Sequence, residues 1–320
     1  MLKLGILTEE QYLSLGKRRQ FLGAHVAYNL LNVGTQPSPK QISVFEDISI
    51  TLRTSNGTFR TTFRNRFEDV DSAAIQWIKT LYPPPARILI QDRAVSHGLT
   101  AKEFADHVFT AYPDADYEAS DLLLSLVELS LDNGDRYITE VDGTPLQYIK
   151  APFVVSVHHP EPLRYPFNRW IAGRARRRFQ KLSLPQGWTK TTGGKGFKVR
   201  QIPYIHPEAQ ALAAKNPGFR FSIRSVFDRT PGACQVLRTM NIFNQDYFSS
   251  QQLEDGAAAA YESVVPGGLW IVGRTMEHDL TNHTTFLERQ HNGWKILGRV
   301  GKGSEMEAVA AKTVEVATPR

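Results

Sequence analysis

The chain has 320 residues, of which 41% are hydrophobic, a formal net charge of +6 and a single cysteine, Cys234. This composition allows a sizeable core, and it excludes a disulfide framework within the chain and a cysteine-rich zinc site. No apolar run approaches the roughly 18 residues that a membrane span needs, and the first residues show no secretory signal, so we expect a cytoplasmic protein.

The first part of the chain predicts a mixed α+β segment. Residues 1 to about 40 read as helical, and residues 42–65 alternate between apolar and polar side chains as a strand does. Ser55-Asn56-Gly57-Thr58 is typical of a hairpin turn, because Asn-Gly tolerates positive φ. A helix over 71–81 then ends at a run of three prolines. We therefore expect an N-terminal α+β extension over 1–85.

From residue 86 the pattern alternates between strands and helices. An apolar run at 88–90 predicts a buried strand, a helix follows around Phe104 and Val108, and a second strand ends at Asp121. Further strands are expected within 135–149, 151–160, 219–228, 233–243 and 267–275, with a helix over 249–264. This alternation predicts an α/β, Rossmann-like, mainly parallel sheet with helices on both faces. We place this domain at 86–305 and expect a loose tail at 306–320.

A basic segment interrupts the alternation and is expected to form a helical insertion over about 160–200. Residues 161–200 hold eleven Lys or Arg and one acid, a net charge of +10, which leaves −4 for the rest of the chain. The helix that it predicts is amphipathic, with Arg and Lys mostly away from one apolar stripe: Phe167, Trp170, Ile171, Ala175, Phe179 and Leu182. Two interpretations stay open. The stripe packs on this protein's own sheet, or residues 164–200 bind an anionic partner, which would be a membrane surface, an acidic partner or nucleic acid.

Five sequence blocks together resemble a known family. They are "ILIQD", "YEASD", "SVFD", "CQVLRTMNIFN" and "VVPGGLWIVGR". Their order and approximate spacing are similar to those of class I S-adenosylmethionine-dependent methyltransferases, over roughly 86–122 and 218–275. The last two blocks look particularly like the chemotaxis-receptor methyltransferase branch, where an Asn follows the fourth strand. The resemblance implies methyl transfer from S-adenosylmethionine to an unidentified acceptor, with a small molecule favoured.

The resemblance also implies roles for individual residues. The acid after the first strand, Asp92, would neighbour the amino-acid part of the cofactor, and Gly98 would be the glycine of the first loop. Asp121, at the end of the second strand, would hold the ribose hydroxyls. The remaining implied cofactor contacts are Val226 and Phe227 near the adenine and Met240 near the sulfonium, and the implied catalytic residues are Arg238 and Asn241.

Departures from the family pattern keep a second function open. The first loop has Gly98 alone, where the family has two or three glycines, and Ser225 stands where many members have an acid. A catalytically inactive protein of the same fold, with a binding or regulatory role, would show the same departures. Asp121 has a structural alternative as well, because it precedes "LLLSLVEL" and would cap a helix there.

Two other chemistries are weaker. "AVSHG", residues 94–98, is similar to the nucleophile turn of a hydrolase, but Gln91-Asp92-Arg93 separates Ser96 from the strand and no His-Gly-Gly segment is visible. His158-His159 would point in different directions on a strand, and no third ligand is spaced sensibly nearby, so no metal site is expected.

Overall fold

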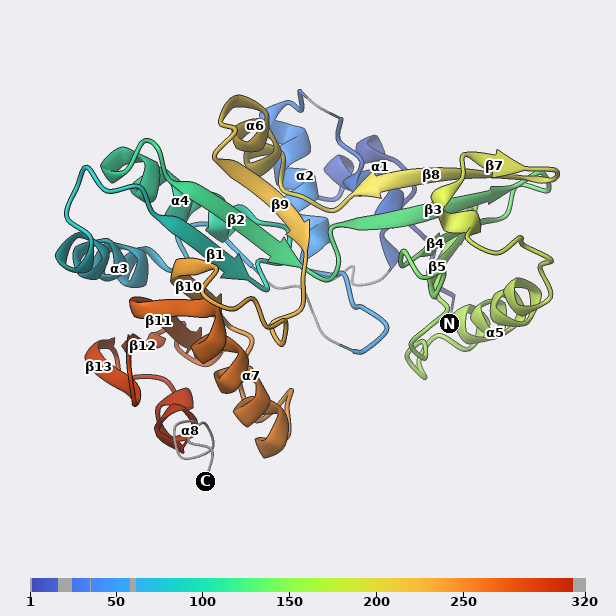
Figure 1. Ribbon diagram of the computed structural model, residues 1–320. Helices are drawn as coiled ribbons and strands as arrows, with labels where there is room; N and C mark the ends of the chain where they lie inside the picture. Colours follow the sequence, from blue (N-terminus) through green and yellow to red (C-terminus); the bar gives the residue numbers. More distant parts are fainter. Residues whose placement is uncertain (1, 17–24, 35, 58–61, 313–320) are drawn as a thin grey trace. The chain divides into compact units, whose positions relative to one another are not determined.

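A computed structural model describes residues 2–16, 25–34, 36–57 and 62–312 of the chain (Figure 1). The chain divides into two compact units, and each unit is built from two separate stretches of sequence. Unit 1 comprises Met1–Thr62 and Leu123–Pro207, and unit 2 comprises Phe63–Leu122 and Glu208–Arg320. Unit 1 therefore contains a long insertion that interrupts unit 2.

Unit 1 is an antiparallel sheet with a hydrophobic core on each face. The strand order is β6-β5-β4-β3-β8-β7. Leu126 belongs to a core with residues of the first two helices, whereas its neighbour Val127 belongs to a core with the basic helix, α5. Successive side chains of a strand point to opposite faces, so helices cover both faces. The elements are α1 (Glu9–Ser14), η3 (Tyr28–Leu31), α2 (Pro39–Ser49), β3 (Ser125–Leu131), β4 (Arg136–Thr139), β5 (Pro145–Lys150), β6 (Phe153–Ser156), α5 (Pro166–Gln180), η4 (Trp188–Lys190), β7 (Gly193–Gly194) and β8 (Phe197–Pro203).

The strand expected from residue 42 is wrong, because helix α2 occupies Pro39–Ser49. The Ser38 hydroxyl oxygen accepts a hydrogen bond from the backbone N–H of Gln41, and Oε1 of Gln41 accepts one from the backbone N–H of Ser38. Such a reciprocal box fixes a helix start whatever pattern follows it. The turn expected at 55–58 is present as far as Gly57, whose N–H donates to the Thr54 carbonyl at 2.9 Å, and residues 58–61 lie outside the described part.

The helix expected over "LLLSLVEL" is also wrong, because these residues lead into strand β3. This strand pairs with β4 on one side and with β8, about 70 residues later in the chain, on the other. The inserted region runs from 123 to 207, so it is larger than the expected 160–200. The expected extension over 1–85 is divided, since residues 63–85 belong to unit 2.

Unit 2 is a seven-stranded sheet with the order β9-β2-β1-β10-β11-β12-β13. The first five of these run parallel to one another, whereas β12 pairs antiparallel with β11 and β13 pairs antiparallel with β12. Numbered along the unit, the order is 3-2-1-4-5-6-7, the arrangement of a doubly wound dinucleotide-binding sheet extended by a hairpin. The strands are β1 (Leu89–Arg93), β2 (Asp116–Asp121), β9 (Phe219–Ile223), β10 (Cys234–Met240), β11 (Val264–Thr275), β12 (Asn282–Gln290) and β13 (Gly293–Val300).

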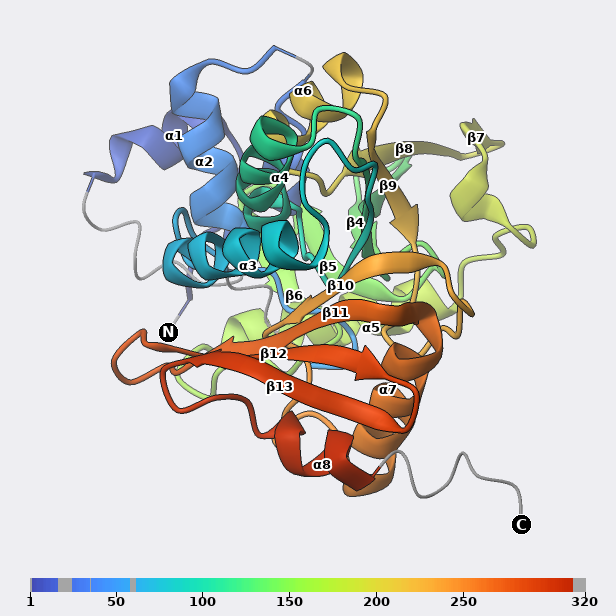
Figure 2. The same cartoon turned by 60° about the vertical axis from the view of Figure 1, so that its left-hand side comes forward.

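Helices cover both faces of this sheet, as Figure 2 shows for α3 and α4 on one side and α7 and α8 on the other. The helices are α3 (Glu68–Leu81), α4 (Leu99–Ala111), α6 (Pro207–Lys215), α7 (Ser250–Ser263) and α8 (Met306–Lys312). The predicted Rossmann-like, mainly parallel sheet is thereby confirmed. The tail expected to be loose from 306 begins instead with α8, which buries Met306 and Ala310, and residues 313–320 lie outside the described part.

Across the described ranges, no helix has both the length and the apolar character that spanning a bilayer requires.

Candidate functional site

The strand order of unit 2 reverses beside β1. The chain runs from β1 to β2 to β9 in one direction and then returns to the other side of β1 as β10. In open parallel sheets ligands bind outside the carboxyl ends of the strands at such a reversal, because the loops leave in opposite directions there. The carboxyl ends here are Arg93 and Met240, so the candidate site comprises the loop after Arg93 and the segment from Asn241.

The loop from Ala94 to Gly98 has an unusual backbone. Ala94 and Ser96 are left-handed at φ 63° and 57°, and Gly98 has φ 80°. Left-handed residues with a Cβ are costly and cluster at functional sites. The Val95 N–H donates to the Ser120 carbonyl at 3.1 Å, and the Ser96 N–H donates to Oδ2 of Asp121 at 2.8 Å. Asp121 therefore fixes the loop at the end of β2.

The hydroxyl of Ser96, in the same loop, is buried and lacks a hydrogen-bond partner among the described residues. A buried hydroxyl without a partner is costly, and a ligand group is one way to satisfy it. A nucleophilic serine would need a base beside it, so this observation does not support the hydrolase interpretation.

Two features of the structure favour glycine at position 98: the left-handed backbone and the close approach of the Phe221 ring. A Cβ on this residue would lie 2.7 Å from the ring of Phe221 on β9. We expect Gly98→Ala to lower the free energy of unfolding by about 2–4 kcal/mol, since it adds this clash to the cost of a left-handed alanine. Gly267→Ala is the control, because Gly267 has φ 77° with open space around it and should cost only about 1 kcal/mol. Equal losses in chemical denaturation would contradict the close packing.

Asn241 is the third left-handed residue that is not glycine at this edge, with φ 58°. Its N–H donates to the Gly273 carbonyl at 2.8 Å, and its Oδ1 accepts a hydrogen bond from the Thr275 N–H at 2.6 Å. Both partners lie on β11, so Asn241 joins the ends of two neighbouring strands. The interpretation that Asn241 satisfies backbone groups is thus supported, and its predicted catalytic role stays a prediction.

Val226 and Phe227, the residues expected near the adenine, lie in a hydrophobic cluster with Phe243 and Phe248. Val226 is buried at 9% exposure, and Met240, the residue expected near the sulfonium, is buried at 5%. The Phe227 ring meets the Phe248 ring edge-on at 5.3 Å and the Phe243 ring at 6.2 Å. These contacts bring the segment after β9 and the segment after β10 together within unit 2.

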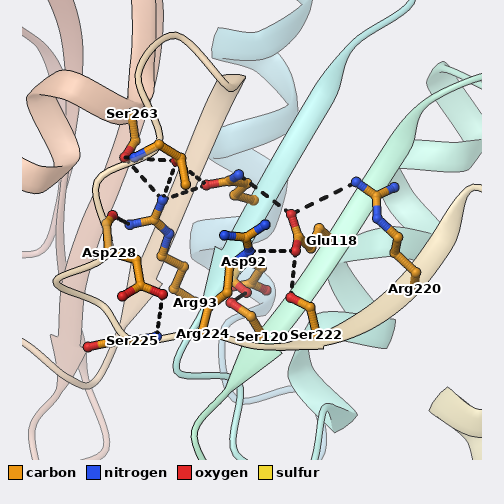
Figure 3. Close-up of polar contacts among 12 residues, drawn as sticks. Asp92, Arg93, Glu118, Ser120, Arg220, Ser222, Arg224, Ser225, Asp228 and Ser263 are labelled. Atoms are coloured by element: carbon orange, nitrogen blue, oxygen red, sulfur yellow. Dashed lines mark hydrogen bonds and ion pairs between the residues drawn. The ribbon is translucent and has the colours of Figure 1, made fainter.

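A polar network holds the loop after β9 against β1 (Figure 3). The buried guanidinium of Arg93 donates to the Asp228 carbonyl at 2.7 Å and to Oε1 of Gln91 at 2.6 Å. It also donates to the hydroxyls of Thr230 and Ser263 at 2.9 and 3.0 Å, and Ser263 lies on α7. The acceptors are neutral, so Arg93 orients the loop that carries Val226 and Phe227 by hydrogen bonding rather than by ion pairing.

The same network continues across the sheet to Glu118 on β2. Arg224 Nε donates to Glu118 Oε1 at 2.7 Å, the Ser222 hydroxyl donates to the same oxygen, and Arg220 lies 3.9 Å from Oε2. Burial alone would raise the pKa of Glu118, but the hydrogen bonds from Arg224 and Ser222 outweigh it and lower the pKa. Figure 3 places these side chains on the face of the sheet that Arg93 occupies.

Asp92 and Arg238 lie on the opposite face, in a buried charged cluster. Arg238 donates to Asp92 Oδ2 at 2.8 Å and to Asp71 Oδ1 on α3 at 3.0 Å, and Tyr117 also donates to Asp92 at 2.7 Å. The rings of Phe67 and Phe104 lie 5.0 Å from the guanidinium carbon. Asp92 and Arg238 are each 1% exposed, so the two residues predicted to contact the cofactor and to act in catalysis are engaged with each other inside the unit.

One arginine between two carboxylates leaves an excess of negative charge. Burial raises the pKa of Asp71 to about 7, although Arg238 opposes the shift. Burial also raises the pKa of Asp92, and the two carboxylates raise that of Arg238 despite its own burial. Because a carboxyl group with a raised pKa keeps its proton to a higher pH, Asp71 titrates near neutral pH.

The structure therefore brings Asp121 and Gly98 together through one loop, and Val226 with Phe227 through another, while it separates Asp92 and Arg238 from them. The sequence does not predict Ala94 or Arg93 as site residues, and it suggests Ser96 only as the nucleophile of a hydrolase. The tripeptide Ser96-His97-Gly98 gives no sign that Ser96 is left-handed, and Arg93 reads as the last polar residue of a strand.

Two cavities lie elsewhere. One, of about 620 Å³, is at the amino ends of β1, β2 and β9 and is lined by Arg87, Asp114 and their neighbours. The other, of about 730 Å³, lies within unit 1 beside α5 and is lined by residues that include His158 and Trp188.

His159 Nε2 lies 2.8 Å from the Thr54 carbonyl, and the described residues contain no group of His, Cys, Asp and Glu that could hold a metal ion.

The fold and the reversal beside β1 define a doubly wound α/β unit. No family model and no curated protein matches the sequence. Among solved structures, the chain is similar to a DszA carbon methyltransferase (TM-score 0.33, 6% identity, covering 68% of this chain and 38% of that one). It is similar as well to the CMeT domain of the citrinin polyketide synthase (TM-score 0.33, 10% identity, 84% and 48%). A third is geranyl diphosphate C-methyltransferase from Streptomyces coelicolor A3(2) (TM-score 0.29, 9% identity, 65% and 46%). The chain spans less than half the length of each.

Proposed function

We propose that unit 2 binds S-adenosylmethionine at the carboxyl ends of β1, β2 and β10 and transfers its methyl group to an acceptor, with a small molecule favoured. The observation that carries the proposal is the loop 94–98, which lies at the reversal of strand order, has left-handed Ala94 and Ser96, and is fixed by Asp121. The family blocks in the sequence occupy β1, β2, β10 and β11 of this same sheet. The resemblance to the chemotaxis-receptor branch rests on the two blocks around β10 and β11, with Asn241 following β10.

The residues at this edge suit such a cofactor. Asp121 lies at the end of β2, the position at which the resemblance implies that the ribose hydroxyls are held, and its Oδ2 accepts a hydrogen bond from the Ser96 N–H. The unpartnered Ser96 hydroxyl offers a hydrogen bond to the amino-acid part of the cofactor. Val226 and Phe227 supply an apolar surface for the adenine, with Arg93 holding their loop in place.

The cofactor, when bound, supplies a methyl group that its sulfonium has already activated. The protein has to orient the acceptor in line with that group and exclude water, which needs no strong base. In this proposal Met240 and Asn241 border the methyl group, because they end β10 beside the loop. Asp92 and Arg238 hold β1, β10 and α3 together beneath the site and do not touch the cofactor.

Calorimetric titration with S-adenosylmethionine and S-adenosylhomocysteine tests the proposal. We expect micromolar binding to the wild-type chain, and a loss of about tenfold or more in Asp121→Asn, because hydrogen bonds to a charged group contribute about 1.5–3 kcal/mol. Asn keeps an acceptor for the Ser96 N–H, so this variant separates ligand binding from loop fixation. Asp114→Asn, exposed at the opposite edge of the sheet, is the matched control and should bind normally. No binding at millimolar cofactor would overturn the proposal.

A further inference from the structure

Helix α5 of unit 1 has two different faces, and only one of them is packed. Asn168, Ala172 and Ala175 are buried, and Ile171 and Phe179 pack against the core of the unit-1 sheet. The interpretation that the apolar stripe packs on the protein's own sheet is confirmed for four of its members, Ile171, Ala175, Phe179 and Leu182. It is wrong for Phe167 and Trp170, which are 61% and 59% exposed.

The two exposed aromatic residues share a stripe with cations. Phe167, Trp170, Arg174, Arg177 and Lys181 follow one another at steps of three and four residues, the spacing that places side chains on one side of a helix. Arg174 lies over the Trp170 ring at 5.8 Å. Leu163, just before the helix, is 82% exposed. Exposed apolar side chains that lie together in a patch mark an interaction surface more often than single exposed ones do.

The charges of this stripe are not neutralised within the described part of the chain. Arg178, next to the stripe, pairs with Asp135, and Arg200 pairs with Glu128. Arg174, Arg177 and Lys181 have no ion pair with any described residue. From 162 to 207 the sequence contains eleven Lys or Arg and no Asp or Glu, so the field around α5 is strongly positive.

We propose that the exposed stripe of α5 docks on an anionic phospholipid surface. Trp, Phe and Leu beside Lys and Arg on one helix face is the arrangement by which helices lie in the membrane interface, with the apolar side chains inserted and the cations at the headgroups. Leu163 decides between this partner and single-stranded nucleic acid. An exposed aliphatic side chain gains from insertion into lipid but cannot stack on a base as an aromatic ring does. This inference is independent of the proposed methyl transfer.

Flotation of the full chain with vesicles tests the proposal. We expect binding to vesicles of 30% phosphatidylserine in phosphatidylcholine, little binding to pure phosphatidylcholine, and a steep loss at about 0.5 M salt, because surface charges are screened there. Phe167→Ser/Trp170→Ser and Arg174→Glu/Arg177→Glu should each weaken vesicle binding about tenfold or more. All four residues are exposed, so we expect both variants to fold, and circular dichroism checks this.

The matched control is Lys215→Glu/Lys312→Glu, which changes the net charge by the same amount on exposed residues of other helices and should bind vesicles as the wild type does. An equal loss of vesicle binding in the control would mean that net charge alone explains the effect, and it would contradict a docking surface on α5. Equal binding to neutral vesicles, or binding of polyuridylate RNA that depends on Trp170 without any vesicle binding, would also overturn it. Loss of cofactor binding has no bearing on these outcomes, so the two proposals fail separately.

Discussion

Arg238→Met should lower the free energy of unfolding of unit 2 by about 3–5 kcal/mol, because it leaves the buried carboxylates of Asp71 and Asp92 without their shared cation. Methionine retains much of the apolar contact with Phe67 and Phe104, so the loss reports the charge rather than a cavity. The measurement is chemical denaturation at pH 8, above the value of about 7 to which burial raises the pKa of Asp71.

Arg93→Met is the matched comparison. Arg93 is buried to the same 1% exposure and lies one strand away, but its acceptors are a carbonyl, an amide and two hydroxyls. A buried neutral acceptor that loses its donor destabilises the fold less than a buried charge that loses its partner. We therefore expect a smaller loss in the free energy of unfolding, about 1–3 kcal/mol. Asp71→Asn/Asp92→Asn added to Arg238→Met should restore part of the stability. If the two arginine variants lose the same amount, the ion pairs contribute little.

The sequence predicted unit 2 well where local signals agree with the final pairing. The strands at 88–90 and 269–272 are continuous apolar runs, and the helix over 249–264 begins at Ser249 with a capping box to Gln252. Parallel strands buried on both faces need no distant information to be recognised. The division into units could not be predicted, because β3 pairs with β8 across about 70 residues of intervening chain and nothing local specifies that pairing.

The candidate site shows the same limit. An acid at a strand end is visible in the sequence, and Asp121 does end β2, where its Oδ2 accepts a hydrogen bond from the Ser96 N–H. Asp92 was assigned to the ligand side, but alternation along β1 places it with Ile90 on the face that α3 and α4 cover, where Arg238 meets it. Which face a strand residue occupies depends on the register, and its partner here lies 146 residues away. Left-handed Ala94, Ser96 and Asn241 have no sequence signature comparable to that of glycine.

The pH dependence of stability distinguishes which force controls the cluster. Burial raises the pKa of Asp71 from its ordinary 3.8 to about 7 in the folded chain. Between these values the unfolded chain loses the proton and the folded chain keeps it, so the unfolded chain binds fewer protons and stability falls as pH rises. The contribution of Asp71 is thus most favourable below about pH 4, declines by up to about 4 kcal/mol by pH 7, and is constant above that.

Asp71→Asn isolates this contribution, since the amide has nearly the same shape and does not titrate. We expect the stability of the wild type relative to Asp71→Asn to decrease as pH rises from 4 to 7, measured by urea denaturation at each pH. The opposite slope, with the wild type gaining stability as pH rises through about 4, would mean that attraction to Arg238 outweighs burial and that the folded-state pKa is lowered. The sign of the difference therefore decides whether burial keeps the carboxyl group of Asp71 neutral or the attraction of Arg238 keeps it ionised.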